Sequence, residues 1–435
     1  MSASPVTLAV VGAGDRGRTY AEYARRWPRR ARVVAVAEPS GERRAAFADR
    51  HSIPADAVFR DWRELAGRPR MADAVLICTL DAQHREPALA LLDLGYHVLL
   101  EKPMAPTLPE CEQIAAAAHA AARRHGSMFA VAHVLRYTSY TRALRRLLDA
   151  GAIGDLISMQ HIEPIGFWHM AHAFVRGNWR KEADSSFMLL AKSCHDMDWM
   201  SHIFGVPCER VSSFGSLQHF RRSKAPRGSA ARCVRCSVER SCPYSAPRIY
   251  GGFLRQGLRD WPLSVVTPDP TPASLRRALE SGPYGRCVYR CDNDMVDHQV
   301  VALEFADGRA ATFTLCAFTT RREGRRSRLF GTHGEIQGDS ETITVDNFRT
   351  GHRRIVDTRK KSRLSLEGHG GGDFGVVHAF VHAVASGDTS QILSGADATL
   401  ESHRIAFAAE RARREGRVVR LAEMKERGAS CRIEP

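Results

Sequence analysis

A glycine-rich turn near the start of the chain constrains the fold more than any other feature. The segment Val10–Gly17 carries Gly12, Gly14 and Gly17 in the spacing G-x-G-x-x-G. It lies between a short apolar run and a stretch with helical spacing, and a second apolar run follows that ends at Glu38. This order of strand, glycine turn, helix, strand and acid predicts a dinucleotide-binding fold.

Each position of this turn has an expected role. Gly12 permits the tight turn, Gly14 lets a pyrophosphate approach the backbone, and Gly17 lets the helix pack close to the strand. The helix start at Asp15 and Arg16 then presents backbone N–H groups to the phosphates. These residues are the predicted phosphate-binding part of a cofactor site.

The choice of cofactor depends on Glu38. Its carboxylate would accept a hydrogen bond from a ribose 2′-hydroxyl and repel a 2′-phosphate, which favours NAD. Arg43 and Arg44 follow closely in the sequence, so NADP remains an alternative cofactor.

The alternation of helical and apolar strand patterns continues to residue 132, with a helix expected at 18–30, a strand at 97–100 and a helix at 108–125. It predicts an α/β, doubly wound parallel sheet of the Rossmann type over residues 1–137. Ligands bind beyond the carboxyl ends of such strands. The polar residues at these ends that we expect to meet a cofactor or substrate are Thr79, His84, Glu101, Lys102, Arg136 and Tyr137.

A different pattern begins at residue 138. Strands separated by turn signals are expected at 156–163, 297–305, 309–316, 327–331 and 335–337. They predict an open-faced, mainly antiparallel sheet domain over 138–435, with helices at 373–386 and 396–415 packing back on the domains. An irregular, Cys-rich insertion is expected at about 213–292.

The composition of the chain limits the classes of binding partner that we expect. The 435 residues carry a formal charge of +15, but arginine is spread along the chain and no DNA-reading motif is visible. We therefore expect a solvated basic surface and no nucleic-acid partner. No apolar run is long enough to cross a bilayer and no signal peptide is recognisable, which predicts a cytoplasmic protein with reduced thiols.

The motifs together resemble the glucose–fructose oxidoreductase/inositol dehydrogenase (Gfo/Idh/MocA) family. The resemblance rests on the glycine fingerprint, the Thr79–His84 loop, Glu101-Lys102-Pro103, Gly-Ala-Ile-Gly at 151–154 and the later His-x-x-Asp. It implies NAD(P)-dependent oxidation of a sugar, polyol or sugar derivative, homo-oligomers formed through the sheet domain, and Lys102 beside the nicotinamide.

The His-x-x-Asp motif supplies the second catalytic candidate. On a helix, Lys192, His195 and Asp198 would share one face. His195 would then take the proton from a hydroxyl as its carbon loses hydride. The family usually has an aspartate where this chain has Ala191, and the neighbouring Lys192 suits an anionic or differently reacting sugar.

A third group of residues is expected at the mouth of the site. Arginine binds carboxylates and phosphates, and aromatic faces hold sugars. The predicted substrate contacts are Arg136, Tyr137, His169, Trp179 and Asp198.

The insertion contains the pattern Cys233-x2-Cys236-x5-Cys242, followed by Cys287-x3-Cys291. Four thiolates at such spacings can bind a structural zinc ion. Four of these five cysteines would suffice, and the spacing does not say which four. We take Cys233, Cys236, Cys242 and Cys291 as the candidate zinc site, with free thiols as the alternative.

Three functions stay open on the sequence. The first is a dehydrogenase that uses Lys102 and His195. The second is an NAD-dependent glycosidase that works by transient oxidation, elimination and hydration, with no net redox change. The third is a non-catalytic dinucleotide-binding sensor.

Overall fold

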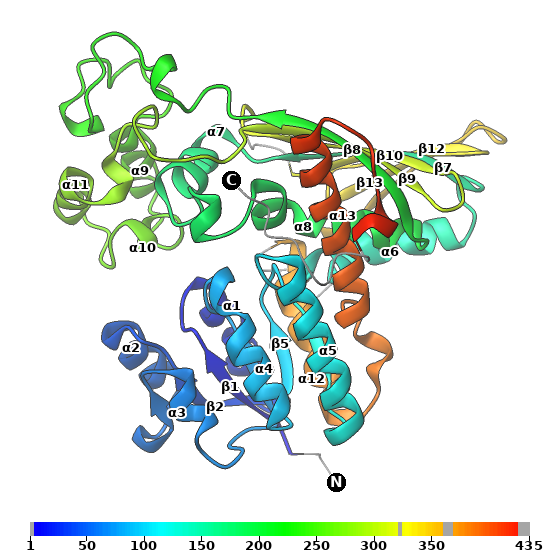
Figure 1. Cartoon of the computed structure of the whole chain (residues 1–435), viewed down its shortest axis with the longest axis horizontal. Coiled ribbons are helices and arrows are strands. Elements are labelled where there is room, and N and C mark those ends of the chain that lie inside the picture. Colours follow the sequence, from blue (N-terminus) through cyan, green and yellow to red (C-terminus); the bar gives the residue numbers. More distant parts are fainter. Residues whose placement is uncertain (1–3, 321–323, 360–368, 425–435) are drawn as a thin grey trace.

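The computed structural model describes residues 4–320, 324–359 and 369–424. The amino-terminal part is a parallel sheet in the order β3-β2-β1-β4-β5-β6 (Figure 1). Its strands are β1 (Val6–Val11), β2 (Ala31–Ala37), β3 (Val58–Phe59), β4 (Ala74–Ile77), β5 (His97–Leu100) and β6 (Phe129–Val131). Its helices are α1 (Asp15–Arg26), α2 (Gly41–His51), α3 (Trp62–Ala66), α4 (Arg85–Asp93) and α5 (Leu108–His125). The predicted Rossmann sheet is confirmed.

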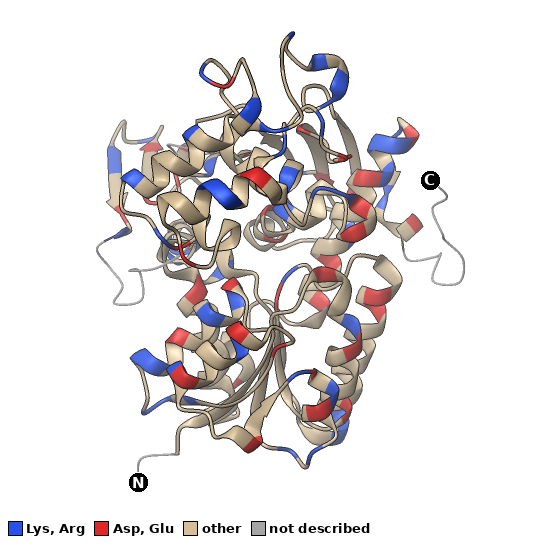
Figure 2. Ribbon diagram, turned by 90° about the vertical axis from the view of Figure 1, so that its left-hand side faces the viewer, with Lys and Arg blue, Asp and Glu red and all other residues tan. Residues whose placement is uncertain are grey.

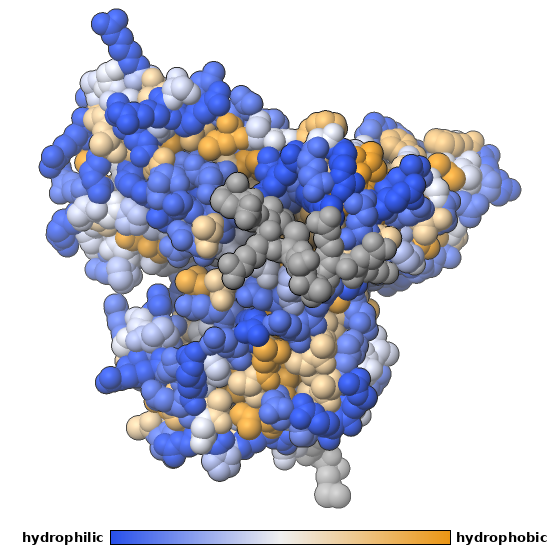
Figure 3. Space-filling model, in the orientation of Figure 1, coloured by the Kyte–Doolittle hydropathy of each residue, from blue (hydrophilic) through white to orange (hydrophobic). Residues whose placement is uncertain are grey.

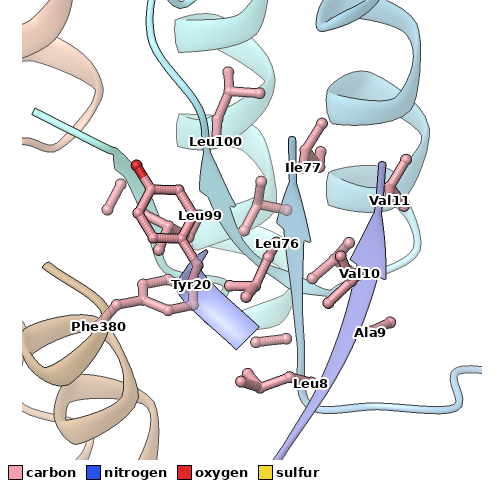
Figure 4. Close-up of a cluster of buried hydrophobic side chains, with 14 of the residues drawn as sticks. Leu8, Ala9, Val10, Val11, Tyr20, Leu76, Ile77, Leu99, Leu100 and Phe380 are labelled. Atoms are coloured by element: carbon pink, nitrogen blue, oxygen red, sulfur yellow. The ribbon is translucent and has the colours of Figure 1, made fainter. Parts of the chain in front are cut away.

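The central strands are mostly apolar because helices cover both faces of the sheet. Leu8 and Val10 of β1 and Leu76 of β4 are completely buried. Figure 4 shows this core, with Tyr20 of α1 lying beside Phe380 of the later helix α12 (Gly372–Ser386). A carboxy-terminal helix thus completes the amino-terminal domain.

The first helix differs from its predicted bounds, 18–30. It begins at Asp15, directly after Gly14, and ends at Arg26. Pro28 disfavours a helical conformation at the residue before it, which explains the early end.

The second domain is a nine-stranded sheet in the order β14-β13-β12-β11-β7-β10-β9-β8-β15. Among the described strands of this sheet, only β7 and β10 pair in parallel, so the predicted, mainly antiparallel sheet is confirmed. Its strands are β7 (Leu156–Pro164), β8 (Cys208–Ser216), β9 (His298–Phe305), β10 (Ala310–Cys316), β11 (Arg326–Gly331), β12 (Gly334–Gly338), β13 (Thr342–Asn347), β14 (Arg353–Asp357) and β15 (Val419–Arg420).

Helices cover one face of this sheet and join it to the first domain. They are α6 (Ser139–Asp149), α8 (Met188–Phe204) and α13 (Ala396–Glu415). Between β7 and α8 the chain forms α7 (Phe167–His169) and the π-helical η4 (Met170–Arg176). Leu400 of α13 belongs to the core of the amino-terminal domain, whereas Ile405 belongs to the core of the sheet domain. Helix α13 therefore spans both domains (Figure 1).

The insertion is more regular than the sequence predicts. It contains helices α9 (Ala246–Arg255), α10 (Leu263–Val266) and α11 (Pro272–Ser281), which lie together at one end of the sheet domain (Figure 1). Its own buried hydrophobic cluster is small and consists of Cys233, Ala246, Tyr250, Leu263, Leu275, Leu279 and Tyr284. The expectation of an irregular segment over this whole range is wrong.

Charged residues are distributed widely. Figure 2 shows Lys and Arg interspersed with Asp and Glu over both domains, and hydrophilic residues dominate the face drawn in Figure 3. Within the described ranges no helix is long and apolar enough to cross a membrane.

Candidate active site

The glycine turn leaves space where a cofactor phosphate would lie. Gly12 has a positive φ of 91°, and a Cβ atom there would lie 2.6 Å from the carbonyl oxygen of Cys78. A Cβ atom on Gly17 would lie 2.0 Å from the carbonyl oxygen of Gly12. At Gly14, by contrast, a Cβ atom would meet nothing within 4 Å. The backbone at Gly14 is thus open to a ligand at the start of α1, where Asp15 lies exposed, as a dinucleotide pyrophosphate requires.

Glu38 lies buried at the end of β2 and beside this turn. Its Oε2 accepts a hydrogen bond from the backbone N–H of Ala13 at 2.9 Å. Its Oε1 accepts hydrogen bonds from the N–H of Ser40 and from the Arg43 guanidinium. The backbone carbonyl of Glu38 accepts from Arg44 at 2.7 Å. The acid and both arginines therefore gather where an adenosine ribose would lie, and the residues present fit a dinucleotide.

Lys102 and His195 come from different domains and meet at their junction. Lys102 follows β5, and its Nζ donates a hydrogen bond to the backbone carbonyl of Ala191 in α8 at 2.9 Å. His195 lies one turn further along the same helix and is buried. Its Nδ1 is buried without a hydrogen-bond partner.

Burial and neighbouring cations keep the His195 ring neutral. Burial lowers the pKa of His195 well below its ordinary value, and the Lys102 ammonium lowers it further. The rings of His133 and His369 have centroids 5.7 Å and 6.0 Å from that of His195. A neutral imidazole beside an ammonium group can accept a proton from a hydroxyl that the ammonium group holds.

Lys192 and Asp198 each form an ion pair with a side chain from another element. Helix α8 is kinked at Ser193 (φ −114°, ψ 15°). Lys192 Nζ lies 3.1 Å from Glu163 Oε1 of β7. Because this carboxylate already neutralises Lys192, the expected pairing of Lys192 with an anionic sugar gains no support.

Arg136 and Asp198 bind each other. The Arg136 Nε and Nη2 atoms each lie 2.7 Å from an Asp198 oxygen, and both side chains are buried. The hydroxyl of Tyr137 contacts Ser394 Oγ at 2.8 Å and accepts a hydrogen bond from the N–H of Leu393. These three predicted substrate contacts are therefore part of the protein's internal hydrogen-bonding network.

Asp81 joins Trp179 to the loop after β4. Trp179 Nε1 donates a hydrogen bond to Asp81 Oδ2 at 3.2 Å. Burial raises the pKa of Asp81, and the His84 and Lys102 side chains oppose that rise. Trp179 is thus placed near Lys102, whereas His169 lies among aromatic rings, with its centroid 5.1 Å from that of Trp261.

His84 fixes the two loops at the ends of β4 and β5. Its Nδ1 lies 2.8 Å from the carbonyl oxygen of Pro103, and its Nε2 lies 3.2 Å from that of Thr79. The His84 side chain therefore positions the Lys102–Pro103 segment, whose peptide bond is cis.

Arg16 and Glu101 take part in a second buried network. Arg16 Nη2 lies 2.6 Å from Asp373 Oδ1, and Arg16 Nε lies 3.3 Å from Glu101 Oε1. Asp373 also contacts His369, one of the rings next to His195. Arg16 thus connects the glycine turn with the surroundings of His195.

The predicted zinc site is not supported. Among the described residues, no group of three or more His, Cys, Asp or Glu side chains is arranged to hold a metal ion. The cavity between the insertion's thiols is lined by Cys287 and not by Cys291. Cys291 instead donates to the backbone carbonyl of Cys287 at 3.3 Å.

Several residues around the site were not predicted. They are Asp81, Asp196, Arg325, His369 and Asp373. Arg325 Nε lies 3.0 Å from Glu163 Oε2 and 2.5 Å from Asp196 Oδ1, which continues the ion-pair network of Lys192. Asp81 lies within the Thr79–His84 loop, the one signal that could have identified it.

Comparison with known proteins identifies the family. The model of the oxidoreductase family with an NAD-binding Rossmann fold matches residues 6–133, and that of its C-terminal alpha/beta domain matches 145–421. The 1,5-anhydro-D-fructose reductase of Ensifer adhaerens is 37% identical over 126 residues, 29% of this chain and 36% of that protein. The 2,7-anhydro-N-acetylneuraminate hydratase of Mediterraneibacter gnavus is 27% identical over 217 residues, 49% of this chain and 54% of that protein.

The sequence matches are partial, whereas the fold matches throughout. The first three curated relatives are matched over 60%, 36% and 57% of their own length. The structure of levoglucosan dehydrogenase with NADH and levoglucosan has a TM-score of 0.68 at 18% identity, covering 96% of this chain and 100% of that one. Since the two family models together cover most of the sequence, the chain belongs to the Gfo/Idh/MocA oxidoreductase family.

Proposed function

We propose that this protein is an NAD-dependent dehydrogenase that oxidises a CH–OH carbon of a sugar, polyol or sugar derivative. The observation that carries this proposal is the hydrogen bond from Lys102 Nζ to Ala191, which brings the lysine of one domain against the His195 helix of the other. NAD, when bound along the glycine turn, supplies the acceptor for hydride.

The roles of the two side chains follow from their charges. The Lys102 ammonium is a hydrogen-bond donor for the substrate oxygen, and a substrate hydroxyl would replace the carbonyl of Ala191 as its acceptor. Its positive charge favours loss of the hydroxyl proton. His195 is neutral in the free protein, so a ring nitrogen is available to accept that proton when the substrate hydroxyl is bound.

The proton then leaves His195 by a route that differs from the usual one in the family. Ala191 stands where the resemblance places an aspartate, and within the described residues no carboxylate makes a hydrogen bond with His195. We therefore infer that His195 releases its proton to water or returns it to the substrate.

A return of the proton to the substrate would suit the second candidate function, a redox-neutral glycosidase or hydratase. One relative is named as a hydratase of an anhydro sugar, which favours keeping this alternative. In both reactions Lys102 and His195 would act at the same hydroxyl. We keep Trp179 and His169 as proposed substrate contacts.

One experiment separates these functions. Purified protein is incubated with NAD and a panel of sugars, polyols, anhydro sugars and glycosides, while NADH and sugar products are both measured. NADH formation supports the dehydrogenase, and product without NADH supports the redox-neutral reaction. Absence of both across the panel would support the sensor.

The variants Lys102→Met and His195→Asn test the assigned roles. Each should lower kcat at least a hundredfold, since general acid–base groups contribute about 10²–10⁴-fold. The exposed residues Lys224 and His352 provide matched controls, and Lys224→Met and His352→Asn should keep full activity. Full activity in either site variant would contradict the mechanism.

We also propose that copies of the chain associate through the open face of the nine-stranded sheet. Phe214 and Val300 are cross-strand partners on this face and are 72% and 43% exposed. Such apolar pairs are unusual on a solvated sheet face.

A further inference from the structure

Net oxidation of a substrate leaves a proton behind in the site. When a CH–OH carbon becomes a carbonyl, its hydride reduces NAD to NADH and the hydroxyl proton passes to His195. His195 has to lose this proton before the next turnover. Among the described residues, two imidazole rings lie next to it, with ring centroids 5.7 Å away for His133 and 6.0 Å away for His369. These two rings are the candidates for the next proton acceptor.

His133 is poorly suited to carry a charge. Its side chain is fully buried, and within the described part of the chain neither ring nitrogen has a hydrogen-bond partner. Burial lowers the pKa of His133 well below its ordinary value, and the cationic side chains of Arg136 and Lys102 lower it further. The carboxylate of Asp198, 3.8 Å from His133 Nδ1, is already paired with Arg136. A proton on His133 would therefore be costly and would have no contact with solvent.

His369 has the opposite surroundings. It begins η10 (His369–Gly371), directly before α12, and its side chain is 37% exposed. Its Nδ1 lies 3.1 Å and 3.2 Å from the two carboxylate oxygens of Asp373. Although burial raises the pKa of Asp373, the Arg16 guanidinium and His369 together lower it below its ordinary value. An ionised carboxylate at this distance stabilises the positive charge that an imidazole takes up with a proton.

The backbone at His369 has an uncommon conformation. His369 has a φ of 46°, and Gly370 and Gly371 follow with φ values of 62° and 82°. A left-handed residue with a side chain persists where its surroundings fix it, and such residues cluster at functional sites. Here the hydrogen bond to Asp373 and the neighbouring His195 ring are such surroundings. His369 thus lies between the buried His195 and solvent.

We propose, on the basis of the dehydrogenase activity proposed above, that His369 passes the proton of His195 to solvent and that Asp373 stabilises the charged His369 ring. An imidazole has two ring nitrogens, so His195 can accept a proton at one and donate from the other. Transfer works within hydrogen-bond reach or through one water molecule, which the 6.0 Å between the ring centroids allows. His369 acts through His195, on the route that the aspartate replaced by Ala191 would otherwise provide.

The test uses a variant that keeps the left-handed backbone. Asparagine adopts this conformation and can still donate a hydrogen bond to Asp373, but its amide cannot carry a proton. For a substrate that the wild type oxidises, His369→Asn should lower kcat about tenfold, short of the about 10²–10⁴-fold contribution of a group that touches the hydroxyl. KM for NAD should stay at the wild-type value. His378→Asn, a matched control at a half-buried position of α12, should keep the wild-type kcat.

Rescue by a diffusible base separates a relay from a purely structural role. In His369→Gly, which also suits the left-handed backbone, added imidazole should raise kcat with its concentration, whereas Lys102→Met should not respond. A wild-type kcat in His369→Asn, or a loss in His369→Gly that imidazole does not restore, would overturn the relay and leave the dehydrogenase standing. Product without NADH, or no turnover by the wild type, would overturn the relay together with the dehydrogenase.

Discussion

The same substitution at two glycines of the cofactor turn should have opposite effects. In Gly14→Ala the new methyl group enters open space, since nothing lies within 4 Å of its position, and φ is −69°, an ordinary value for alanine. In Gly17→Ala the methyl group would lie 2.0 Å from a backbone oxygen, that of Gly12, which has to move. Gly14→Ala therefore tests whether the open space holds a ligand, and Gly17→Ala tests the close packing of the helix against the turn.

The structure gives the size of both effects. Gly14→Ala should leave the free energy of unfolding unchanged or raise it by about 0.4–1 kcal/mol, since alanine restricts the unfolded chain. NAD should bind at least tenfold more weakly, a loss of about 1.4 kcal/mol, because the methyl group occupies the path of the pyrophosphate. Gly17→Ala should destabilise the protein by about 1–3 kcal/mol through overpacking.

Two measurements separate these effects. Thermal unfolding without NAD should give a Tm at or slightly above the wild-type value for Gly14→Ala and a Tm several degrees lower for Gly17→Ala. Calorimetric titration with NAD should show weakened binding in Gly14→Ala. Wild-type NAD affinity in Gly14→Ala would refute the assignment of this space to the phosphates, and a wild-type Tm in Gly17→Ala would refute the packing argument.

Three further predictions concern charges. The pKa values of His133, His195 and His403 are lowered, mainly by burial, while in the unfolded chain they titrate near 6.5. The free energy of unfolding should therefore be highest above about pH 6.5 and fall below it, by up to about 1.4 kcal/mol per pH unit for each histidine; a flat profile in urea titrations between pH 7.5 and 5.5 would contradict this. Glu38→Gln should lower the NAD/NADP ratio of kcat/KM at least tenfold, since the charge that repels a 2′-phosphate is lost; an unchanged ratio would assign the choice to other residues. Asp198→Asn should cost about 3–5 kcal/mol in urea unfolding, because it leaves the buried Arg136 cation uncompensated, and a cost below 1 kcal/mol would show that the pair is dispensable.

Local signals in the sequence were sufficient for much of the fold. The helix at 108–125 has its predicted bounds because Thr107 caps its first turn and Gly126 ends it in the left-handed conformation. Strand β5 (His97–Leu100) also has its predicted bounds, since it is apolar and bordered by Gly95 and Pro103. Such signals lie within a few residues of the element they define.

Elements that depend on distant partners were not predicted. Strand β14 (Arg353–Asp357) is largely exposed and polar, and only its pairing with β13 makes it a strand. The partner of Lys192 was not predicted for the same reason, because helical spacing says nothing of a kink at Ser193 or of the strand that supplies Glu163. The spacing of residues in the sequence therefore identified candidate site residues but not the side chains that they contact in the fold.

The contacts that each candidate site residue makes within the protein determine whether its side chain is free to bind a substrate. The guanidinium of Arg136 and the ammonium of Lys192 each have a carboxylate partner from another element, which completes their electrostatic requirements within the protein. Among the described residues Lys102 has no carboxylate partner within ion-pair distance, and its ammonium reaches only a backbone carbonyl. His195 keeps a buried ring nitrogen without a hydrogen bond. Both ring nitrogens of the neighbouring His133 are also buried without a hydrogen bond. Since a folded chain rarely leaves buried polar groups without partners, we expect a bound substrate to supply hydrogen bonds at this cluster, beside the Lys102 ammonium.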